Sequence, residues 1–423
     1  MPDTAPELSL LVIPHREKED WAQLLPRIRS ALAPLDIEYE ILVAAHENSR
    51  SHLEENRYIL ISPAINGYGD MMRAAIQKAS GKYLMTMDAD QAPPFDFLCN
   101  LWNARDSAEI MIGSRYVDGG TATMPSIRRM VSSLSNFVFS RGLDLQVRDM
   151  SSAFRLYKGS VIRSVSTRSS GYDILQELLV KARMEGHRIG EIPFHYHSDD
   201  PAYGRALRFG WAYLQTFVRL WKLRNSIASA DYDARAYNAL MPPQRYWQRR
   251  RYEIITTLIK ENGQERCLDV GCGSSRIIGA LPQGSIALDI LIRKLRYARR
   301  FGRPTVQGSI FNLPIPDGAF PSVLCSQVIE HVPRANVLDE LDRVLQPGGY
   351  LILGTPDYAN WQWLLIEWLY KVLLPQAYAD EHITHYTYSE LVEEFVSKRG
   401  YKLEAVKYIL KGELILGLRK PVH

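Results

Sequence analysis

The feature that most constrains the fold of this 423-residue sequence is an alternation of short, apolar, β-rich segments with longer helix-like ones. In the first half the β-rich segments are LSLLVIP, EYEILVA, RYILIS, KYLMTMD and EIMIGSR, beginning at Leu8. Parallel strands need long crossover connections, most often helices, so this order predicts βαβ units and a mostly parallel sheet. The fold class is therefore α/β.

The same alternation starts again after Glu265, with RCLDVGCG, SIALDI, PSVLCSQV and GYLILGTP, and ends in KLEAVKYI and ELILGLRK. Small and polar residues, a Pro-Pro pair and a basic stretch fill the region between the two patterns. A chain of this length exceeds what one hydrophobic core usually organises. We therefore expect two α/β domains, residues 1–228 and 229–423.

The overall charge excludes few functions, because 51 Lys and Arg against 47 Asp and Glu leave only +4. This balance gives no reason to expect a nucleic-acid partner. The four cysteines lack CxxC spacing, and no segment reaches the roughly 18 uncharged apolar residues that a membrane span needs. The N-terminus also lacks the basic region of a signal peptide. We expect a cytoplasmic enzyme.

The segment TMDADQAPP is the sharpest feature of the first half. Asp88 and Asp90 stand at the C-terminal end of a predicted strand, where open α/β sheets bind ligands, and strand alternation points both the same way. Two carboxylates can hold Mg²⁺ or Mn²⁺, which neutralises a diphosphate leaving group. The alternative is a solvated acidic turn that caps the next helix.

Four further segments surround this pair in a fixed order: NGYGDMMRAAIQKASGKY before it, then GSRYVDGG, DMSSAFRLYK and GYDILQELLVKARMEGHRIGEIPF. Together they resemble the dolichyl-phosphate-mannose-synthase-like branch of family-2 glycosyltransferases, over roughly residues 8–225. The resemblance implies a GT-A fold and metal-dependent, inverting transfer from a nucleotide-diphosphate sugar. The implied acceptor is a polyprenyl phosphate or another lipid-linked molecule.

By this resemblance Asp88 and Asp90 bind the metal and the sugar diphosphate, while Asp149, Ser151 and Arg155 line the acceptor and phosphate side. Arg155 suits bidentate recognition of a phosphate, or else forms a surface ion pair with Asp149. A phosphate acceptor is already an anion, whereas a hydroxyl acceptor would need a carboxylate such as Asp149 to take its proton.

Two segments depart from the pattern of the family. VAAHENSR replaces an acidic VDDGS-like turn that reads the nucleotide, with Glu47 or Asn48 as substitutes, and PHREKE replaces a PTYNE-like segment, with Glu17 as a shifted candidate. These departures leave the donor open. They also leave the alternative of an active methyltransferase domain joined to a degenerate, binding-only transferase domain.

Residues 204–224 form a basic amphipathic helix when wound at about 100° per residue. Its basic side holds Arg205, Arg208, Arg219 and Lys222. Its apolar side, opposite, holds Leu207, Trp211, Leu214, Val218 and Trp221. Such a helix suits the interface of an anionic membrane, which would place the enzyme peripherally on the inner face. The alternative is that the apolar side packs on the domain core.

In the second half, CLDVGCGSSRIIGAL puts Gly271 and Gly273 directly after a strand, where missing side chains let the backbone approach a ligand. Asp289 ends the next strand, 20 residues after Asp269. At this distance a carboxylate meets ribose hydroxyls in a dinucleotide-type βαβ unit. The spacing predicts an adenosine ligand.

NAD and S-adenosyl-L-methionine both carry adenosine, and three later segments distinguish between them. These segments are QGSIFNLPIPDGAF, SQVIEHV and LDELDRVLQPGGYLILGTP. With the glycines they resemble class I methyltransferases dependent on S-adenosyl-L-methionine (SAM), of the ubiquinone- and menaquinone-biosynthesis type (methyltransferase type 11), over about residues 231–420. This implies a Rossmann-like domain in which Asp269, Gly271 and Gly273 cradle the methionine end and Asp289 holds the ribose.

The resemblance also implies that Ser309 and Ile310 flank the adenine, although an Asp commonly stands where Ser309 does. Ser326, Gln327 and His331 would face the methionine or the acceptor. His331, or a histidine of DEHITHYT (His382 and His385), could take a proton from an acceptor hydroxyl, which favours O-methylation. The methylated molecule would be the glycan, its carrier or a related metabolite, and the chain a bifunctional enzyme.

The segment WQWLLIEWLYKVLLPQAY is apolar on nearly all sides but too short to cross a membrane. We expect a buried lid helix there.

Overall fold

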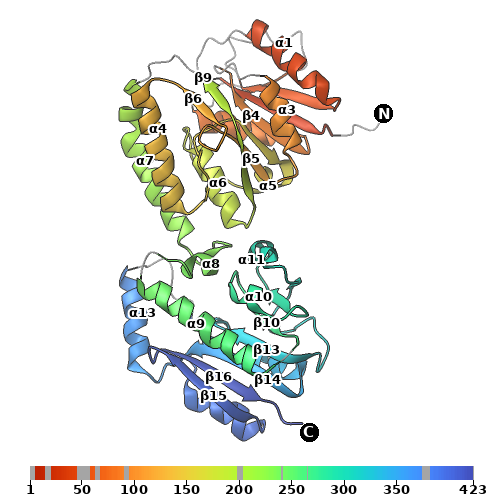
Figure 1. Ribbon diagram of the computed structural model, residues 1–423, viewed down its shortest axis with the longest axis vertical. Helices are drawn as coiled ribbons and strands as arrows, with labels where there is room; N and C mark the ends of the chain where they lie inside the picture. The colour runs from red at the N-terminus through yellow and green to blue at the C-terminus, as the bar shows by residue number, and fades with distance from the viewer. Residues whose placement is uncertain are drawn as a thin grey trace. The chain divides into compact units, whose positions relative to one another are not determined.

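The computed structural model describes residues 5–14, 21–44, 58–61, 67–89, 95–197, 203–239, 242–263, 265–373 and 382–422. The chain divides into two compact units, Met1–Arg183 with His187–Arg224, and Met184–Gly186 with Asn225–His423 (Figure 1). The first unit ends a few residues before the domain boundary predicted from the sequence.

A seven-stranded sheet with the order β3-β2-β1-β4-β7-β5-β8 forms the centre of the first unit. Its strands are parallel except for β7, which runs antiparallel between β4 and β5. The five predicted strands are confirmed, and β7, β8 and the small β6-β9 sheet are additions. The strands are β1 (Leu8–Ile13), β2 (Tyr39–Ala44), β3 (Tyr58–Ile61), β4 (Tyr83–Asp88), β5 (Ile110–Ser114), β6 (Thr121–Thr123), β7 (Arg155–Lys158), β8 (Ile189–Pro193) and β9 (His195–His197).

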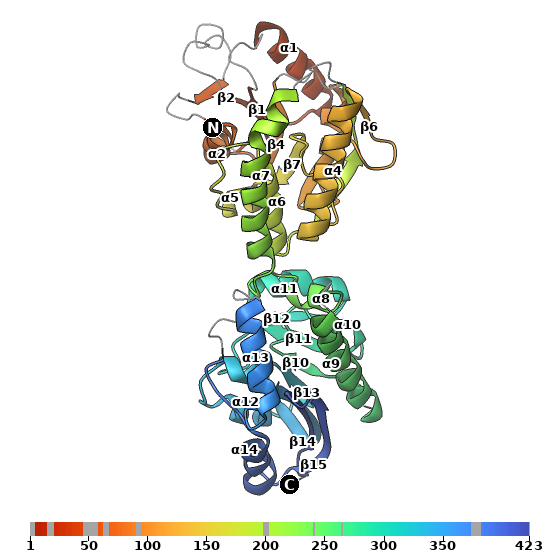
Figure 2. The ribbon, with the colours of Figure 1, turned by 90° about the vertical axis from the view of Figure 1, so that its left-hand side faces the viewer.

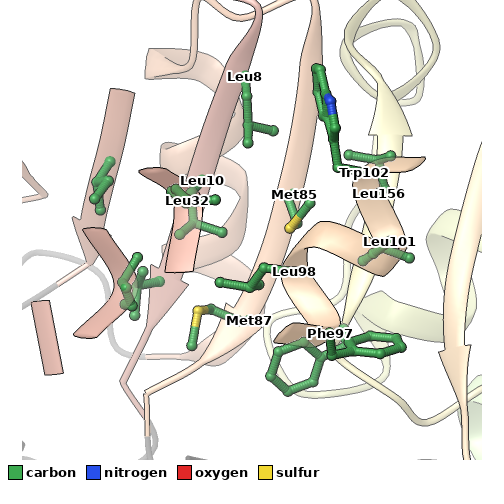
Figure 3. Packing of buried hydrophobic residues seen from close by; sticks show 14 of the residues in the cluster. Leu8, Leu10, Leu32, Met85, Met87, Phe97, Leu98, Leu101, Trp102 and Leu156 are labelled. Carbon is green, nitrogen blue, oxygen red and sulfur yellow. The ribbon is translucent and has the colours of Figure 1, made fainter. Parts of the chain in front are cut away.

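Strand alternation divides the side chains of β4 between two layers. Met85 and Met87 pack with Leu98 in a core between the sheet and the pair α1 and α3 (Figure 3). Thr86 and Asp88 therefore point to the opposite face, where α2 packs on β1 and β2. The helices of this unit are α1 (Trp21–Leu32), α2 (Tyr68–Lys78), α3 (Asp96–Asn103), α4 (Ser126–Leu143), α5 (Gly159–Ser164), α6 (Ile174–Met184) and α7 (Tyr203–Arg224).

The second unit contains another seven-stranded sheet, with the order β12-β11-β10-β13-β14-β16-β15. The first five strands are parallel, and β16 runs antiparallel between β14 and β15. The strand order reverses its direction between β10 and β13, so this is the switch point at which such sheets bind ligands. The strands are β10 (Leu268–Val270), β11 (Ile286–Asp289), β12 (Thr305–Gln307), β13 (Phe320–Ser326), β14 (Leu345–Pro356), β15 (Lys402–Ile409) and β16 (Glu413–Arg419).

The helix predicted as a buried lid, α13, has only part of its surface buried. Trp363 packs against Trp247 of α9, but Trp361, Leu364 and Trp368 are exposed. The prediction of a buried helix was wrong for these three residues, because the helix is apolar on nearly all sides and, in the part whose side chains the structure describes, they face solvent. In the described part of the chain, no helix is both long and apolar enough to cross a membrane. The helices of this unit are α8 (Tyr232–Ala236), α9 (Pro242–Glu261), α10 (Ile277–Ala280), α11 (Ile292–Ala298), α12 (Val337–Val344), α13 (Trp361–Leu373) and α14 (Tyr388–Val392).

Candidate functional sites

Asp88 ends β4 beside the end of β1, at the point where the first sheet reverses its strand order. The residue is 5% exposed, and its carboxylate accepts a hydrogen bond of 2.8 Å from the hydroxyl of Tyr68, the first residue of α2. Burial and then the charge of Asp88 raise the pKa of Tyr68 well above its ordinary value, so the hydroxyl remains a donor. Tyr68 thus orients Asp88, a role that the sequence did not reveal.

The second predicted metal ligand, Asp90, lies outside the described residues, as do Glu17, Glu47 and Asn48. The predicted pairing of Asp88 with Asp90 therefore stays a prediction. A buried carboxylate at the C-terminal end of a central strand is nevertheless the ligand type that Mg²⁺ and Mn²⁺ prefer.

Two glycines at the start of α2, Gly67 just before the helix and Gly69 as its second residue, allow close packing within the unit. A Cβ atom on Gly67 or Gly69 would lie 2.2 Å from the carbonyl oxygen of Ser170 or Ser169, respectively. The start of α2 therefore rests directly on the backbone before α6, and the amide of Gly69 donates to Ser170. This contact positions Tyr68, and through it Asp88.

Asp149 is fully buried and its carboxylate is held by Arg115, from the GSRY segment after β5. Arg115 donates from Nε to Oδ2 at 2.7 Å and from Nη2 to Oδ1 at 2.8 Å, while the backbone amides of Ser151 and Ser152 also donate to Oδ1. Burial alone would raise the pKa of Asp149, but the charge and hydrogen bonds of Arg115 hold it below the ordinary value. These contacts make Asp149 a poor general base, contrary to the expectation for a hydroxyl acceptor.

Arg155 is fully buried in the middle of the sheet, because β7 lies between two other strands. Its guanidinium donates to the carbonyl oxygens of Ser152, Leu175 and Met150, at 2.8, 2.6 and 2.6 Å. The alternative of a surface ion pair with Asp149 is wrong, since Arg115 occupies that place. The geometry favours a positioning role for Arg155 under the DMSS loop over direct contact with phosphate.

Removing either partner of the Arg115–Asp149 pair should destabilise the first unit strongly. A buried pair broken on one side leaves an uncompensated charge, so we expect Arg115→Ala to lower the free energy of unfolding by about 3–5 kcal/mol. Denaturant unfolding monitored by circular dichroism measures the loss. Arg148→Ala is the matched control, because Arg148 pairs with the fully exposed Asp118. A loss for Arg115→Ala no larger than for the control would contradict the assignment.

In the second unit the backbone after β10 has the conformation that only glycine adopts easily. Gly271 and Gly273 have φ values of +70° and +56°. A Cβ atom on Gly271 would lie 2.3 Å from the side chain of Val328, and the amide of Gly273 donates to Oδ2 of Asp289 at 2.8 Å. The loop is thereby tied to the end of β11, and its ligand role stays a prediction.

Asp269 and Asp289 lie on neighbouring parallel strands and are both buried. Burial, and after it the charge of Asp289, raises the pKa of Asp269 to about 8. A cationic ligand at this place would favour the ionised carboxylate. The ammonium and sulfonium charges of SAM meet that requirement, so the residues present fit this cofactor.

The other predicted cofactor residues stand around the same edge of the sheet. Ser326 is the last residue of β13, and Ser309 and Ile310 follow β12. Ile310 is buried, and the hydroxyl of Ser309 accepts a hydrogen bond from the amide of Phe311. Because parallel strands end at one edge, the structure brings these residues to the side where Asp289 ends β11.

His331 lies close to His382, with ring centres 4.8 Å apart, whereas the ring of His385 stacks on Tyr358 at 4.0 Å. The neighbour of His331, Glu330, is fully buried, and burial raises its pKa to about 8. Sequence reasoning did not single out Glu330 or Tyr358. The EHV sequence after β13 was the available signal for Glu330.

Comparison with known proteins places the two halves in different families. Residues 10–165 match the family described as glycosyl transferase family 2, and residues 268–353 match a methyltransferase domain family. A dolichol-phosphate mannosyltransferase of Pyrococcus furiosus is 26% identical over 237 residues, which are 52% of this chain and 65% of that protein. A low-salt glycan biosynthesis hexosyltransferase of Haloferax volcanii is 27% identical over 231 residues, 52% of each chain. This chain thus spans between about half and 65% of the length of these relatives.

A solved structure of a SAM-dependent methyltransferase from Methanosarcina mazei is 22% identical, with 40% of this chain and 98% of that chain covered and a TM-score of 0.33. Both families predicted from the sequence are confirmed, as is the α/β class of both units. The chain joins a family 2 glycosyltransferase domain, matched over residues 10–165, to a methyltransferase domain, matched over residues 268–353.

Proposed function

We propose that this chain is a bifunctional enzyme. The first unit transfers a sugar with inversion from a nucleotide-diphosphate sugar, and the second transfers a methyl group from SAM to the glycan, its carrier or a related metabolite. The observation that supports the proposal is the position of the predicted ligand residues. Asp88 lies at the switch point of the first sheet, and Asp269 lies on β10 at the switch point of the second, with Asp289 on the neighbouring β11.

In the first unit Asp88, with Asp90, would hold Mg²⁺ or Mn²⁺, which when bound neutralises the departing diphosphate. Tyr68 keeps the carboxylate of Asp88 in place. Asp149 is committed to Arg115, so an acceptor that needs no deprotonation suits this site better than a hydroxyl. A phosphate acceptor such as polyprenyl phosphate fits this condition, and the mannosyltransferase relative is named for dolichol phosphate.

In the second unit Asp269, Gly271 and Gly273 would cradle the methionine end of SAM, and Asp289 the ribose. SAM, when bound, supplies a methyl group on a positively charged sulfur. Because methyl transfer is a displacement, the protein mainly aligns the acceptor oxygen and excludes water. His331 follows β13 in the chain, and its ring centre lies 4.8 Å from that of His382. We expect these two imidazoles to meet an acceptor hydroxyl, which would give O-methylation.

A product assay tests this function. The full chain is incubated with Mn²⁺, polyprenyl phosphate and a panel of nucleotide sugars, with and without SAM. We expect one donor to give a glycosylated lipid, and a further gain of one methyl group when SAM is present. Methylation without any glycosyl transfer would instead favour the alternative, an active methyltransferase with a binding-only first domain.

We further propose that α4 and α7 rest on an anionic membrane. In Figure 2 the two helices lie in front of the sheet, and Phe139 of α4 packs on Phe217 of α7. In the described part of α7 the apolar residues Leu214, Val218 and Trp221 are exposed, while Arg219 reaches Glu177 within the unit. The sequence alternative, with this apolar side on the core, is therefore wrong for these three residues.

The neighbouring α4 continues the exposed apolar surface. Its exposed large side chains fall within one third of the helix circumference: Met130, Val131, Leu134, Phe137 and Val138. Arg129, Arg141 and Lys222 are exposed on the same two helices. An anionic membrane complements both the apolar and the basic side chains.

Vesicle binding checks this surface. We expect Leu134→Ser with Phe137→Ser to weaken binding of the full chain to vesicles rich in anionic lipid by at least about tenfold, since each exposed side chain loses apolar burial worth about 1 kcal/mol or more. Cosedimentation measures the affinity, and Tyr246→Ser, which is exposed in the second unit, serves as the control. Equal binding of the double variant and the unaltered chain would rule the surface out.

A further inference from the structure

Three side chains from two segments distant in sequence converge beside the C-terminal end of β13. These are Glu330, His331 and His382, and one possible ligand atom from each lies within 4.8 Å of the others. Donor atoms around a single ion, each bound at about 2.1 Å, are about 3 to 4 Å apart. A small inward movement would therefore bring the three atoms to one metal ion.

Backbone hydrogen bonds hold the two segments together. The amides of Ile383 and Thr384 donate to the carbonyl oxygen of Glu330 at 2.8 and 3.0 Å. The hydroxyl of Thr384 donates to the carbonyl oxygen of Val332 at 2.6 Å. These three bonds fix His382 opposite His331 before any ligand arrives, as a preorganised site requires.

The carboxylate of Glu330 lacks the partners that a buried acid normally has. It is fully buried, and Thr355 donates to Oε2 at 3.2 Å. Among the residues that the structure describes, no hydrogen-bond donor reaches Oε1. Burial of a carboxylate is costly unless a cation or several donors compensate it, so this oxygen points to a positive ligand.

His382 has the surroundings of a metal-binding imidazole. Its Nδ1 lies 2.6 Å from the hydroxyl of Tyr358 and 3.8 Å from Oε1 of Glu367, and its ring stacks on Trp363. Metal-bound histidines usually donate their other ring N–H to an oxygen in this way, which fixes the tautomer and the ring orientation. Coordination would then use Nε2.

We propose that Glu330, His331 and His382 bind one divalent transition-metal ion and that this ion holds the acceptor hydroxyl of the methyltransferase domain. Two imidazoles and a carboxylate suit borderline ions such as Zn²⁺, Fe²⁺ or Co²⁺ better than Mg²⁺ or Ca²⁺. The site differs in this respect from the predicted all-carboxylate site of the first unit.

The ion would change the route of the proton. A hydroxyl bound to it loses its proton to water at a lower pH, and the resulting alkoxide attacks the methyl carbon. The new C–O bond forms as the C–S bond breaks. The electron pair of the C–S bond returns to sulfur, which leaves S-adenosylhomocysteine with an uncharged sulfur. His331 thus acts as a ligand instead of a general base. This role rests on the proposed methyl transfer, whereas binding of the ion does not.

The test uses the full chain with Asp88→Ala and Asp90→Ala, so that the first unit offers no competing site. After chelator treatment the protein is titrated with Co²⁺, followed by its visible spectrum, and with Mg²⁺. We expect Co²⁺ to bind in a one-to-one ratio, and His382→Ala to weaken this binding at least about 100-fold. Tyr358→Phe should weaken it about 10- to 100-fold, the usual cost of losing the oxygen behind a metal-bound histidine.

His385→Gln is the matched control, because this imidazole of the same segment is outside the cluster. It should bind Co²⁺ as tightly as the parent, which is the chain that carries only Asp88→Ala and Asp90→Ala. S-Adenosylhomocysteine binding by each variant shows that the domain is folded. No Co²⁺ binding by a parent chain that binds S-adenosylhomocysteine, or equal Co²⁺ affinity in all variants, would overturn the site. Co²⁺ binding that depends on His382 without methyl transfer to any acceptor would support the site and contradict the proposed methyltransferase activity.

Discussion

Replacing Asp88 by asparagine should reduce glycosyl transfer by about 1,000-fold or more, because in the proposed mechanism this carboxylate holds the metal ion that neutralises the leaving diphosphate. Asparagine keeps the volume of the side chain and can still accept the hydrogen bond from Tyr68. The loss would therefore report the charge and not a collapse of the fold. Initial rates with the donor found in the product assay measure it.

Two comparisons make this result specific. Tyr68→Phe removes the hydroxyl that orients Asp88 but not the charge, so we expect a loss of about tenfold, corresponding to one hydrogen bond. Binding of S-adenosylhomocysteine should be the same in Asp88→Asn and in the unaltered chain. Glycosyl transfer that persists at the original rate in Asp88→Asn would remove Asp88 from the reaction.

Replacing Asp269 by asparagine should have opposite effects on cofactor binding and on stability. In the proposed site this variant lacks the charge that would meet the ammonium group of the methionine end, so we expect S-adenosylhomocysteine to bind about 10- to 100-fold more weakly. Without a ligand, however, the variant no longer buries an acid whose pKa is raised to about 8. We expect the free energy of unfolding of the variant to rise by about 1 kcal/mol or more, which corresponds to an increase of about 2–4 °C in Tm.

The pH dependence follows from the direction of that shift. The folded chain holds the proton on Asp269 more tightly than the unfolded chain does, so its contribution to stability is full below about pH 4 and is lost as pH rises to about 8. The advantage of Asp269→Asn should therefore be larger at pH 8 than at pH 5. Thermal unfolding at both values checks this, with the surface change Asp317→Asn as control. An advantage that is the same at pH 5 and pH 8 would contradict the buried pair.

The strands could be predicted wherever their pattern was local. β4 and β10 are buried apolar segments whose neighbours in sequence already indicate a sheet, and Asp88 and the two glycines were found because they stand where these strands end. β7 was missed because it is four residues long and polar at both ends. Its place between β4 and β5 depends on pairings with distant residues.

Side-chain partners were harder to predict than positions. Asp149 was recognised, but its partner Arg115 is 34 residues away. Whether Arg115 or Arg155 pairs with Asp149 depends on which strand is central in the sheet. Glu330 stands in VIEHV beside the predicted His331, yet its burial follows from Thr355 and from the segment after His382. Only the folded chain brings these groups together.

Calorimetric titration shows whether one chain carries two working ligand sites. The purified chain is titrated with S-adenosylhomocysteine and with a panel of nucleoside diphosphates, each with and without Mn²⁺. We expect S-adenosylhomocysteine to bind, and one nucleotide to bind only with Mn²⁺ and not to Asp88→Asn. Binding of S-adenosylhomocysteine alone would contradict this expectation and leave the first unit as a degenerate transferase domain.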